Sequence, residues 1–453
     1  MGAAKPCVTL FLSMNAYLAK SSVVAALGGL LFGFDTAVIA GATAALTTTY
    51  ALSPATLGLT VAAALYGTIL GAMFGGLPGD LYGRRASLRI TAVLYLLSAL
   101  GCAFAFDWYS FVAARFIGGL GIGASSVLGP MYIAEIAPPK LRGRMVGLFQ
   151  FNIVFGILAA YFSNFVIGTM GFGAAEWRWK LGVSGIPAAL FLVALFTIPE
   201  SPRWLAKRGR VAEAGDVLRS TGDPNYKEDL AEIVESLDPR HGSGNEPLFQ
   251  RKYRIPIYLA ISIGMFNQLS GINAVLYYLN DIFAKAGFTK VSGDLQAVAV
   301  GATNLVFTII AMSVIDRIGR KTLLLIGSVG CAVSLAGVAV IFLSGTHQEL
   351  LVWCLVAFIG SFGFSQGAVI WVYLSEVFPT RVRAKGQSLG SFTHWAMNAL
   401  ISGIFPVLAA SSGGAPFVFF SIMMVVQFFV VLATYPETKG HSLEEMERKL
   451  GIA

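Results

Sequence analysis

Long apolar runs separated by short polar segments recur along the whole sequence. A helix needs about 20 predominantly apolar residues to cross the hydrocarbon core of a bilayer, and these runs are of about that length. Backbone groups in lipid must be satisfied within the segment, so each run is predicted to be a helix. The pattern predicts an all-α membrane protein with twelve transmembrane helices, at approximately 22–44, 57–78, 89–106, 109–133, 145–168, 180–198, 255–284, 294–315, 322–343, 349–375, 387–409 and 416–434.

The loops between these runs carry positive charge in alternation. Lys and Arg follow the second, fourth, eighth and tenth runs, whereas the loops around 45–56, 344–348 and 410–415 contain neither residue. Loops rich in Lys and Arg stay on the cytoplasmic side of a membrane. The pattern predicts a multi-pass protein of the cell (inner) membrane with both termini in the cytoplasm. The basic residues are Arg84, Arg85 and Arg89; Lys140, Arg142 and Arg144; Arg317, Arg320 and Lys321; and Arg381, Arg383 and Lys385.

Composition agrees with this class and excludes others. The chain is 56% hydrophobic and 12% charged, with a net charge of +8. A basic chain can bind nucleic acid, but here the charge lies in membrane-flanking loops, so we expect the lipid bilayer and no nucleic acid as a partner. Cys102, Cys331 and Cys354 lie in apolar runs and Cys7 lies near the start, without metal-ligand spacing. No metal site, cofactor or disulfide framework is predicted.

The apolar runs divide the chain into two sets of six, joined by one long polar segment. Within that segment we predict a short helix at Val211–Arg219, and Leu230, Ile233, Val234 and Leu237 follow the spacing of one helical face. These short helices are expected to lie against the cytoplasmic side of the bundle, with a loop at Gly242–Gly244. The predicted domains are a cytoplasmic lead-in at 1–21, a six-helix bundle at 22–198, a helical linker at 199–254, a second bundle at 255–434 and a tail at 435–453.

An internal repeat relates the two sets. Asp80-Leu-Tyr-Gly-Arg-Arg recurs 236 residues later as Asp316-Arg-Ile-Gly-Arg-Lys. Glu135 and Glu376 each stand seven residues before an arginine, and Pro199-Glu-Ser recurs as Pro436-Glu-Thr. Two six-helix halves of this kind are typical of transporters that work by alternating access.

The repeated charges suggest a cytoplasmic gate. We expect the pairs Glu135–Arg142 and Glu376–Arg383 to bridge adjacent helix ends, holding this side shut in one state and breaking in the other. The alternative is that the arginines only keep their loops inside, which leaves the glutamates unexplained. The predicted gate residues are Asp80, Arg84, Arg85, Glu135, Arg142 and Glu200 in the first half and Asp316, Arg320, Glu376, Arg383 and Glu437 in the second.

One carboxylate, Asp35, lies midway along the first run, in the glycine-rich stretch 28–41. An ionisable residue within a membrane is costly and is a functional candidate by default. The cation placed to neutralise it is Arg115 in the fourth run. We predict a proton-coupling pair; the alternative is a structural ion pair that joins two helices.

Several motifs resemble the sugar porter family of the major facilitator superfamily. They are Gly83-Arg-Arg after the second run, PESPRWL at 199–205, QLSGINAVLYY at 268–278, RIGRKTL at 317–323, SEVFPTRVR at 375–383 and PETKG at 436–440. The resemblance extends from about Gly28 to Met446. It implies two six-helix bundles, a helical intracellular segment between them and a central monosaccharide site.

A monosaccharide presents hydroxyls and apolar ring faces, which call for amides and aromatic rings. Such side chains lie within the runs, although a single amide can equally serve as a contact between helices. The Ser270-Gly271 pair marks a point where the seventh run could bend. The predicted sugar-binding residues, partly implied by the resemblance, are Phe32, Gln150, Asn267, Gln268, Asn273, Tyr277, Asn304, Gly367, Trp371 and Trp395.

The chain departs from the family pattern at several positions. Gly367-Ala368 replaces the usual Gly-Pro, which leaves the kink of the tenth run in doubt, and Leu81 replaces a basic residue. His394 stands where relatives carry Asn or Gln. Ile157 replaces a glutamine of xylose-type members, which favours a hexose over a pentose.

Three functions remain open at this level. A proton-coupled monosaccharide symporter is favoured because Asp35 and Arg115 supply a titratable pair. Its expected substrate is a hexose such as glucose, with xylose as the alternative. A facilitative uniporter is the alternative, and a non-transporting sugar sensor a third. No nucleophile–base pair points to an enzyme. The expected partners are a monosaccharide, a proton and the bilayer, with the protein working as a monomer.

Overall fold

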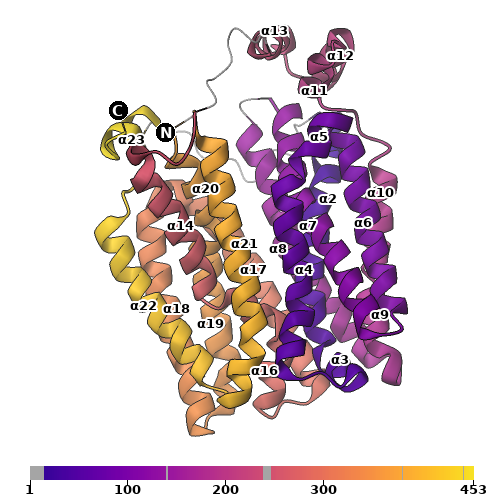
Figure 1. Ribbon diagram of the computed structural model, residues 1–453, viewed down its shortest axis with the longest axis vertical. Helices are drawn as coiled ribbons and strands as arrows, with labels where there is room; N and C mark the ends of the chain where they lie inside the picture. Colours follow the sequence, from indigo (N-terminus) through magenta and orange to yellow (C-terminus); the bar gives the residue numbers. More distant parts are fainter. Residues whose placement is uncertain (1–14, 139–140, 238–245, 380, 442, 453) are drawn as a thin grey trace.

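Two bundles of helices stand side by side, one from each half of the chain (Figure 1). The computed structural model describes residues 15–138, 141–237, 246–379, 381–441 and 443–452, and within these ranges it contains helices and no β-strand. Three short helices, α11–α13, project at one end beside α5 (Figure 1). We call this the basic end, because the arginine-rich loops lie there. The all-α fold with two six-helix bundles agrees with the prediction.

Side-chain caps mark the starts of some helices of the first bundle. Ser53 and Asp107 accept hydrogen bonds from the first turns of α4 and α7, and Pro54 opens α4. The helices are α2 (Ala16–Val38, continued by the 3-10 turn η1, Ile39–Gly41), α3 (Thr43–Tyr50), α4 (Pro54–Phe74), α5 (Gly76–Tyr82), α6 (Arg84–Phe104), α7 (Trp108–Ile136), α8 (Arg142–Thr169), α9 (Glu176–Gly182) and α10 (Gly185–Ala194).

The second bundle also has six membrane segments, of which the seventh and the tenth of the chain are interrupted. Its elements are η4 (Arg251–Tyr253), α14 (Arg254–Leu269), α15 (Ile272–Tyr277), α16 (Leu279–Lys285), α17 (Lys290–Ile318), α18 (Arg320–Ser344), η5 (Gln348–Leu350), α19 (Leu351–Phe364), α20 (Gln366–Glu376), α21 (Arg383–Ser411) and α22 (Ala415–Thr434), followed by the short α23 (Leu443–Lys449).

The sixth predicted membrane helix is not continuous. In the described part of the chain, eleven helical segments are long and apolar enough to cross a membrane, and the run at 180–198 is not among them. It forms α9 and α10, beginning at Glu176 and interrupted at Val183–Ser184. Glycines at 182 and 185 flank the break, and Pro187 brings no backbone N–H to the first turn of α10.

The seventh and tenth runs are also broken, for different reasons. Gly271 separates α14 from α15 with φ +78°, and a Cβ there would lie 2.3 Å from the ring of Phe420. Only glycine suits both constraints, so the predicted bend at Ser270-Gly271 is confirmed. The tenth run breaks at Ser365 (φ −123°, ψ −89°), two residues before Gly367, although Ala368 replaces the usual proline.

Glycines allow α2 and α8, the first and fifth membrane helices, to pack closely together. A Cβ on Gly33 would lie 1.8 Å from the carbonyl oxygen of Ile153, and one on Gly29 would lie 2.6 Å from that of Phe149. These contacts join α2 and α8 within the first half. The glycine-rich stretch around Asp35 therefore allows close packing of two membrane helices.

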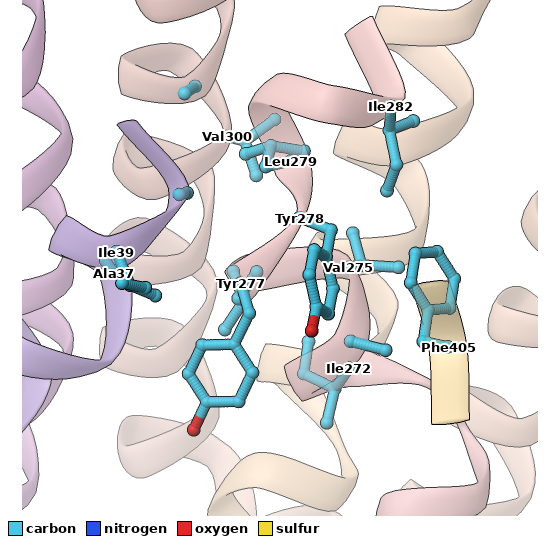
Figure 2. Close-up of a cluster of buried hydrophobic side chains, with 14 of the residues drawn as sticks. Ala37, Ile39, Ile272, Val275, Tyr277, Tyr278, Leu279, Ile282, Val300 and Phe405 are labelled. Carbon is cyan, nitrogen blue, oxygen red and sulfur yellow. The ribbon is translucent and has the colours of Figure 1, made fainter. Parts of the chain in front are cut away.

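The two halves meet most closely at the end opposite the basic end. At this end, a Cβ on Gly58 of α4 would lie 1.9 Å from the carbonyl oxygen of Gly403 on α21. The hydroxyl of Tyr161 in α8 donates to the carbonyl of Leu276 in α15 at 2.7 Å. Figure 2 shows Ala37 and Ile39 of the first half facing α15 and α16 of the second.

The linker forms the predicted short helices, but they contact each other more than the bundle. The helices are α11 (Pro202–Lys207), α12 (Val211–Ser220, confirming the helix predicted from Val211) and α13 (Tyr226–Ser236). Apolar residues of α13 pack on α11 and α12, whereas α11 binds α5 through the Trp204 indole N–H and the Asp80 carbonyl at 3.0 Å. The expectation that these helices lie against the bundle is confirmed for α11. The predicted loop at 242–244 lies outside the described residues.

Candidate functional site

The structure pairs Asp35 with Arg115 inside the first bundle. Arg115 Nη1 donates to Asp35 Oδ1 at 2.7 Å, joining α2 to α7. The side chain of Asp35 is 13% exposed and that of Arg115 is 3% exposed, so this is a buried ion pair. Oδ2 of Asp35 has no hydrogen-bond partner among the described residues. The arginine thus holds the carboxylate through one of its two oxygens.

A cavity of about 10 Å³ adjoins this pair. Asp35 and Arg115 line it from the first half, with Phe32 and Thr36, whereas Tyr277 and Trp395 line it from the second. A space of this size is close to the minimum that holds one water molecule. The ion pair and three of the predicted sugar-binding aromatics, Phe32, Tyr277 and Trp395, therefore share one narrow space between the halves.

Amide side chains form a bonded cluster at the break between α14 and α15. Gln268 Nε2 donates to Asn267 Oδ1, and Gln268 Oε1 accepts from Asn273 Nδ2, both at 2.9 Å. Asn267 and Gln268 are buried, and Asn273 is half-buried. The turn at Gly271 allows Asn273 to reach back to Gln268. The structure thus brings together three of the five predicted amides.

Aromatic rings extend this cluster toward the first half. The ring of His394 lies 5.2 Å from that of Trp371 and 5.0 Å from that of Trp395, and Trp395 lies 5.4 Å from Phe32. The Gln268 amide nitrogen is within 3.3 Å of both ring nitrogens of His394. Trp371 remains 38% exposed, which leaves part of its indole available for stacking against a ligand.

His394 is the residue of this cluster that sequence reasoning left without a role. The available signal was its place directly before Trp395 in an apolar run. The remaining predicted residues lie outside the bonded cluster: Gln150 is half-buried on α8, Asn304 is buried on α17 and Gly367 is half-buried on α20. No hydrogen bond within the described residues joins Gln150 or Asn304 to the cluster.

The repeated charged motifs of the first half converge at the basic end. Arg84 binds Glu135 through Nε and Nη2 at 2.9 and 3.0 Å and Asp80 through Nη1 at 2.9 Å. The Ser201 hydroxyl donates to Glu135 at 2.5 Å, and Glu200 accepts from the backbone N–H of Arg85. We call this set of Asp80, Arg84, Glu135, Glu200 and Ser201 the first-half clamp. It joins α5, α6, α7 and α11.

The second half repeats the arrangement almost atom for atom. Arg320 binds Glu376 through Nε and Nη2 at 3.1 and 2.8 Å and pairs with Asp316 at 2.9 Å. Thr438 donates to Glu376 at 2.6 Å, and Glu437 accepts from the backbone N–H of Arg320. These residues, Asp316, Arg320, Glu376, Glu437 and Thr438, are the second-half clamp. The sequence repeat is therefore a repeat of a three-dimensional ion-pair network.

Local geometry explains both clamps. Gly83 and Gly319, with φ of +97° and +104°, turn the chain at the starts of α6 and α18. A carboxylate caps the new helix in each case. Burial raises the pKa of the Glu437 carboxyl, but backbone N–H groups of Lys439, Arg320, Lys321 and Thr438 donate to it and hold that pKa below its ordinary value.

The predicted pairing within each motif needs correction. Glu135 is bound by Arg84 rather than by Arg142, which is exposed at the start of α8 and makes no ion pair among the described residues. Glu376 is bound by Arg320, and Arg383 Nε donates to the Phe378 carbonyl at 3.5 Å. Both clamps tie helices within one half rather than across the two halves.

Comparisons with known proteins agree with this architecture. The model of the family described as sugar (and other) transporter matches residues 21–450. The chain is 37% identical to the arabinose-proton symporter of Bacillus subtilis, with 94% of each chain covered. It is 36% identical to the D-xylose-proton symporter of Escherichia coli (96% of each chain) and to the glucose transport protein of Synechocystis (94% of this chain, 96% of that one).

Solved structures give the same result. The inward-open conformation of the E. coli xylose transporter XylE superposes with a TM-score of 0.86 at 35% identity, covering 96% of this chain and 100% of XylE. XylE bound to 6-bromo-6-deoxy-D-glucose superposes with a TM-score of 0.78 at 34% identity, covering 96% and 99%. With the two-bundle fold and the repeated clamps, these findings establish that the chain belongs to the sugar porter family of the major facilitator superfamily.

Proposed function

We propose that this protein is a proton-coupled monosaccharide symporter of the cell (inner) membrane that works by alternating access. The observation that carries the proposal is the shared cavity between the halves, lined by Asp35 and Arg115 on one side and by Tyr277 and Trp395 on the other. A proton site and a sugar site that share one space can affect each other directly. The proton-symporter names of relatives from Bacillus and E. coli support the same function.

Asp35 is the proton carrier in this proposal. Arginine remains protonated at all physiological pH values, so the carboxylate is the member of the pair that titrates. Arg115 lies 2.7 Å from this carboxylate and neutralises it. Movement of α7 away from α2 would leave a buried charge, which uptake of a proton would relieve. Sugar binding that moves these helices would thereby couple the two fluxes.

The amide and aromatic cluster holds the sugar. The hydrogen bonds among Asn267, Gln268 and Asn273 are neutral and exchangeable, so sugar hydroxyls can replace them. Trp371 offers a partly exposed ring for the apolar face of the sugar. We propose a hexose such as glucose as the first candidate, because buried Ile157 offers no polar group, and D-xylose as the second.

The conformation and orientation are assigned on two grounds. The basic end is proposed to face the cytoplasm, because the alternating loops rich in Lys and Arg lie there. The higher TM-score with inward-open XylE than with its sugar-bound form supports an inward-facing state. The clamps would then keep each half rigid while the halves move against each other.

Uptake by purified protein in liposomes tests the function. Labelled glucose, xylose and arabinose are offered with and without an inwardly directed proton gradient. We expect accumulation above the external concentration of at least one sugar, with glucose preferred, only when the gradient is present. Uptake that stops at equilibrium under both conditions would favour the uniporter. Binding without uptake would favour the sensor.

Gln268→Ala and Trp371→Ala are expected to weaken sugar binding while the protein still folds. Loss of one hydrogen bond to a buried hydroxyl costs about 1–3 kcal/mol, which corresponds to about 5- to 150-fold in the dissociation constant. Binding of the transported sugar is measured by calorimetry, with Trp353→Ala as a control because Trp353 is 69% exposed on α19. Unchanged affinity in both variants would remove these residues from the site.

A further inference from the structure

A second charged network lies at the end opposite the basic end, between the two halves. Lys180 Nζ on α9 lies 3.2 Å from Asp294 Oδ2 on α17 and 2.9 Å from Glu176 on its own helix. Lys290 Nζ on α17 completes the set at 2.7 Å from Glu176. Asp294 also accepts a hydrogen bond from Asn280 of α16. The network therefore joins the sixth membrane segment of one half to the seventh and eighth of the other.

Its central ion pair is fully enclosed. The side chains of Lys180 and Asp294 are 0% and 2% exposed, and Glu176 is 10% exposed. A buried charge is costly unless it is paired and hydrogen-bonded, so this arrangement exists only while α9 and α17 are in contact. Trp177 and Leu181, beside these charges on α9, belong to the apolar cluster that includes the residues of Figure 2.

The order of the charges along each helix is informative. Glu176 and Lys180 are four residues apart on α9, and Lys290 and Asp294 are four residues apart on α17. Oppositely charged residues at this spacing lie on the same helical face and can pair with each other. Each helix therefore carries its own neutralising partner, and separation of the helices would leave two neutral pairs rather than four single charges.

We propose that these four residues form a self-neutralising lock that closes the outer end of the transport pathway in the inward-facing state. The lock rests on the alternating-access function proposed above. In the closed state Lys290 binds Glu176 and Lys180 binds Asp294. On opening, Lys180 stays with Glu176 and Lys290 turns to Asp294, so the charges remain paired in both states.

An ion-pair contact that held the two halves together permanently, which we call a staple, would be expected to have a different charge pattern. Two acids on one helix and two bases on the other would attract each other more strongly, but would leave like charges four residues apart on separation. The mixed order instead lowers the difference in electrostatic energy between the closed and open states. This is the property expected of a contact that breaks in every transport cycle.

Spin labels at Met170 and Leu350 can measure the opening, because both are exposed, at the outer ends of the first and second half. The native cysteines are replaced by alanine in this background. We expect Lys180→Met and Asp294→Asn to shift the distance distribution toward longer, open-state distances. Lys285→Met is the matched control, since Lys285 lies at the same end but donates to Ala409 within its own half.

Variants with rearranged charges can distinguish a lock that opens in each transport cycle from a permanent staple. Lys180→Asp combined with Asp294→Lys places two negative charges on α9 and two positive charges on α17. We expect this variant to stay closed at the outer end and to transport at least tenfold more slowly. Adding Glu176→Lys and Lys290→Glu restores one charge of each sign to the two lock positions of each helix and should recover opening.

Two results would overturn the proposal. Distance distributions of Lys180→Met and Asp294→Asn that match the Lys285→Met control would exclude a lock. Wild-type opening in the double charge rearrangement would exclude the self-neutralising order. The distance measurement requires neither a transported sugar nor a proton gradient, so its outcome is independent of whether the proposed symport is correct.

Discussion

Asp35→Asn is expected to abolish accumulation of sugar driven by a proton gradient while leaving sugar binding and equilibrium exchange intact. The amide has nearly the shape of the protonated carboxyl and cannot ionise. Arg115 keeps a hydrogen-bond acceptor, and the amide and aromatic cluster on the second half is untouched. Each proton moving down one pH unit releases about 1.4 kcal/mol, enough for about tenfold accumulation, so the ratio should fall from about ten or more to one.

The measurement is uptake into liposomes at equal protein density, compared with counterflow of the same sugar. Asp216→Asn is a suitable control, because Asp216 is an exposed acid on α12 that pairs only with Arg219 on the same helix among the described residues. If the Asp35 variant still concentrated sugar against its gradient, the proton would have to use another group. If it lost binding as well, the ion pair would hold the fold of the site rather than the coupling.

Gly58→Ala and Gly33→Ala are expected to fail in different ways, although each added Cβ would collide with a backbone oxygen at 1.9 and 1.8 Å. Gly33 packs on Ile153 within the first half, whose helices must touch in every state. Its replacement should prevent recovery of folded protein. Gly58 packs on Gly403 across the two halves, and that contact can separate, so its replacement should give folded protein held open at the outer end and unable to transport.

Size-exclusion profiles in detergent report folding, and spin labels at Met170 and Leu350 report the outer opening. Gly76→Ala is the control, since a Cβ placed on this glycine has no atom of another segment within 4 Å among the described residues. A Gly58 variant with wild-type transport would mean that α4 and α21 do not close on each other in the cycle. A well-folded Gly33 variant would show that the α2–α8 contact tolerates more separation than its geometry suggests.

The membrane helices and the internal repeat were readable from the sequence because both depend on local pattern. Apolar length indicates a span in lipid, and glycine in Ser270-Gly271 marks a break that needs a positive φ. The break at Ser365 has no such signal, because neither proline nor glycine stands there. Likewise, the sixth run is apolar enough to form one helix. It is divided at Val183–Ser184, where the flanking Gly182 and Gly185 lower the helix propensity.

The sequence indicates which charged residues are important, but it does not show which of them pair with each other in the folded protein. The sequence identifies the charged residues of the clamps, but an arginine seven residues further along the chain is not the partner of either glutamate. Arg84 lies 51 positions before Glu135, and only the packing of α6 against α7 brings them together. The outer charges of Lys180 and Asp294 were missed because each alone is an ordinary charge near a membrane boundary.

The clamps also bear on how the protein is made. The residues that complete each clamp, Glu200 and Ser201 or Glu437 and Thr438, come directly after the last membrane helix of their own half. A chain emerging from the ribosome therefore has every partner of its first clamp soon after α10 has been synthesised. The first half can assemble as a closed unit while the second is still being translated, whereas the second must wait for the last segment of the chain.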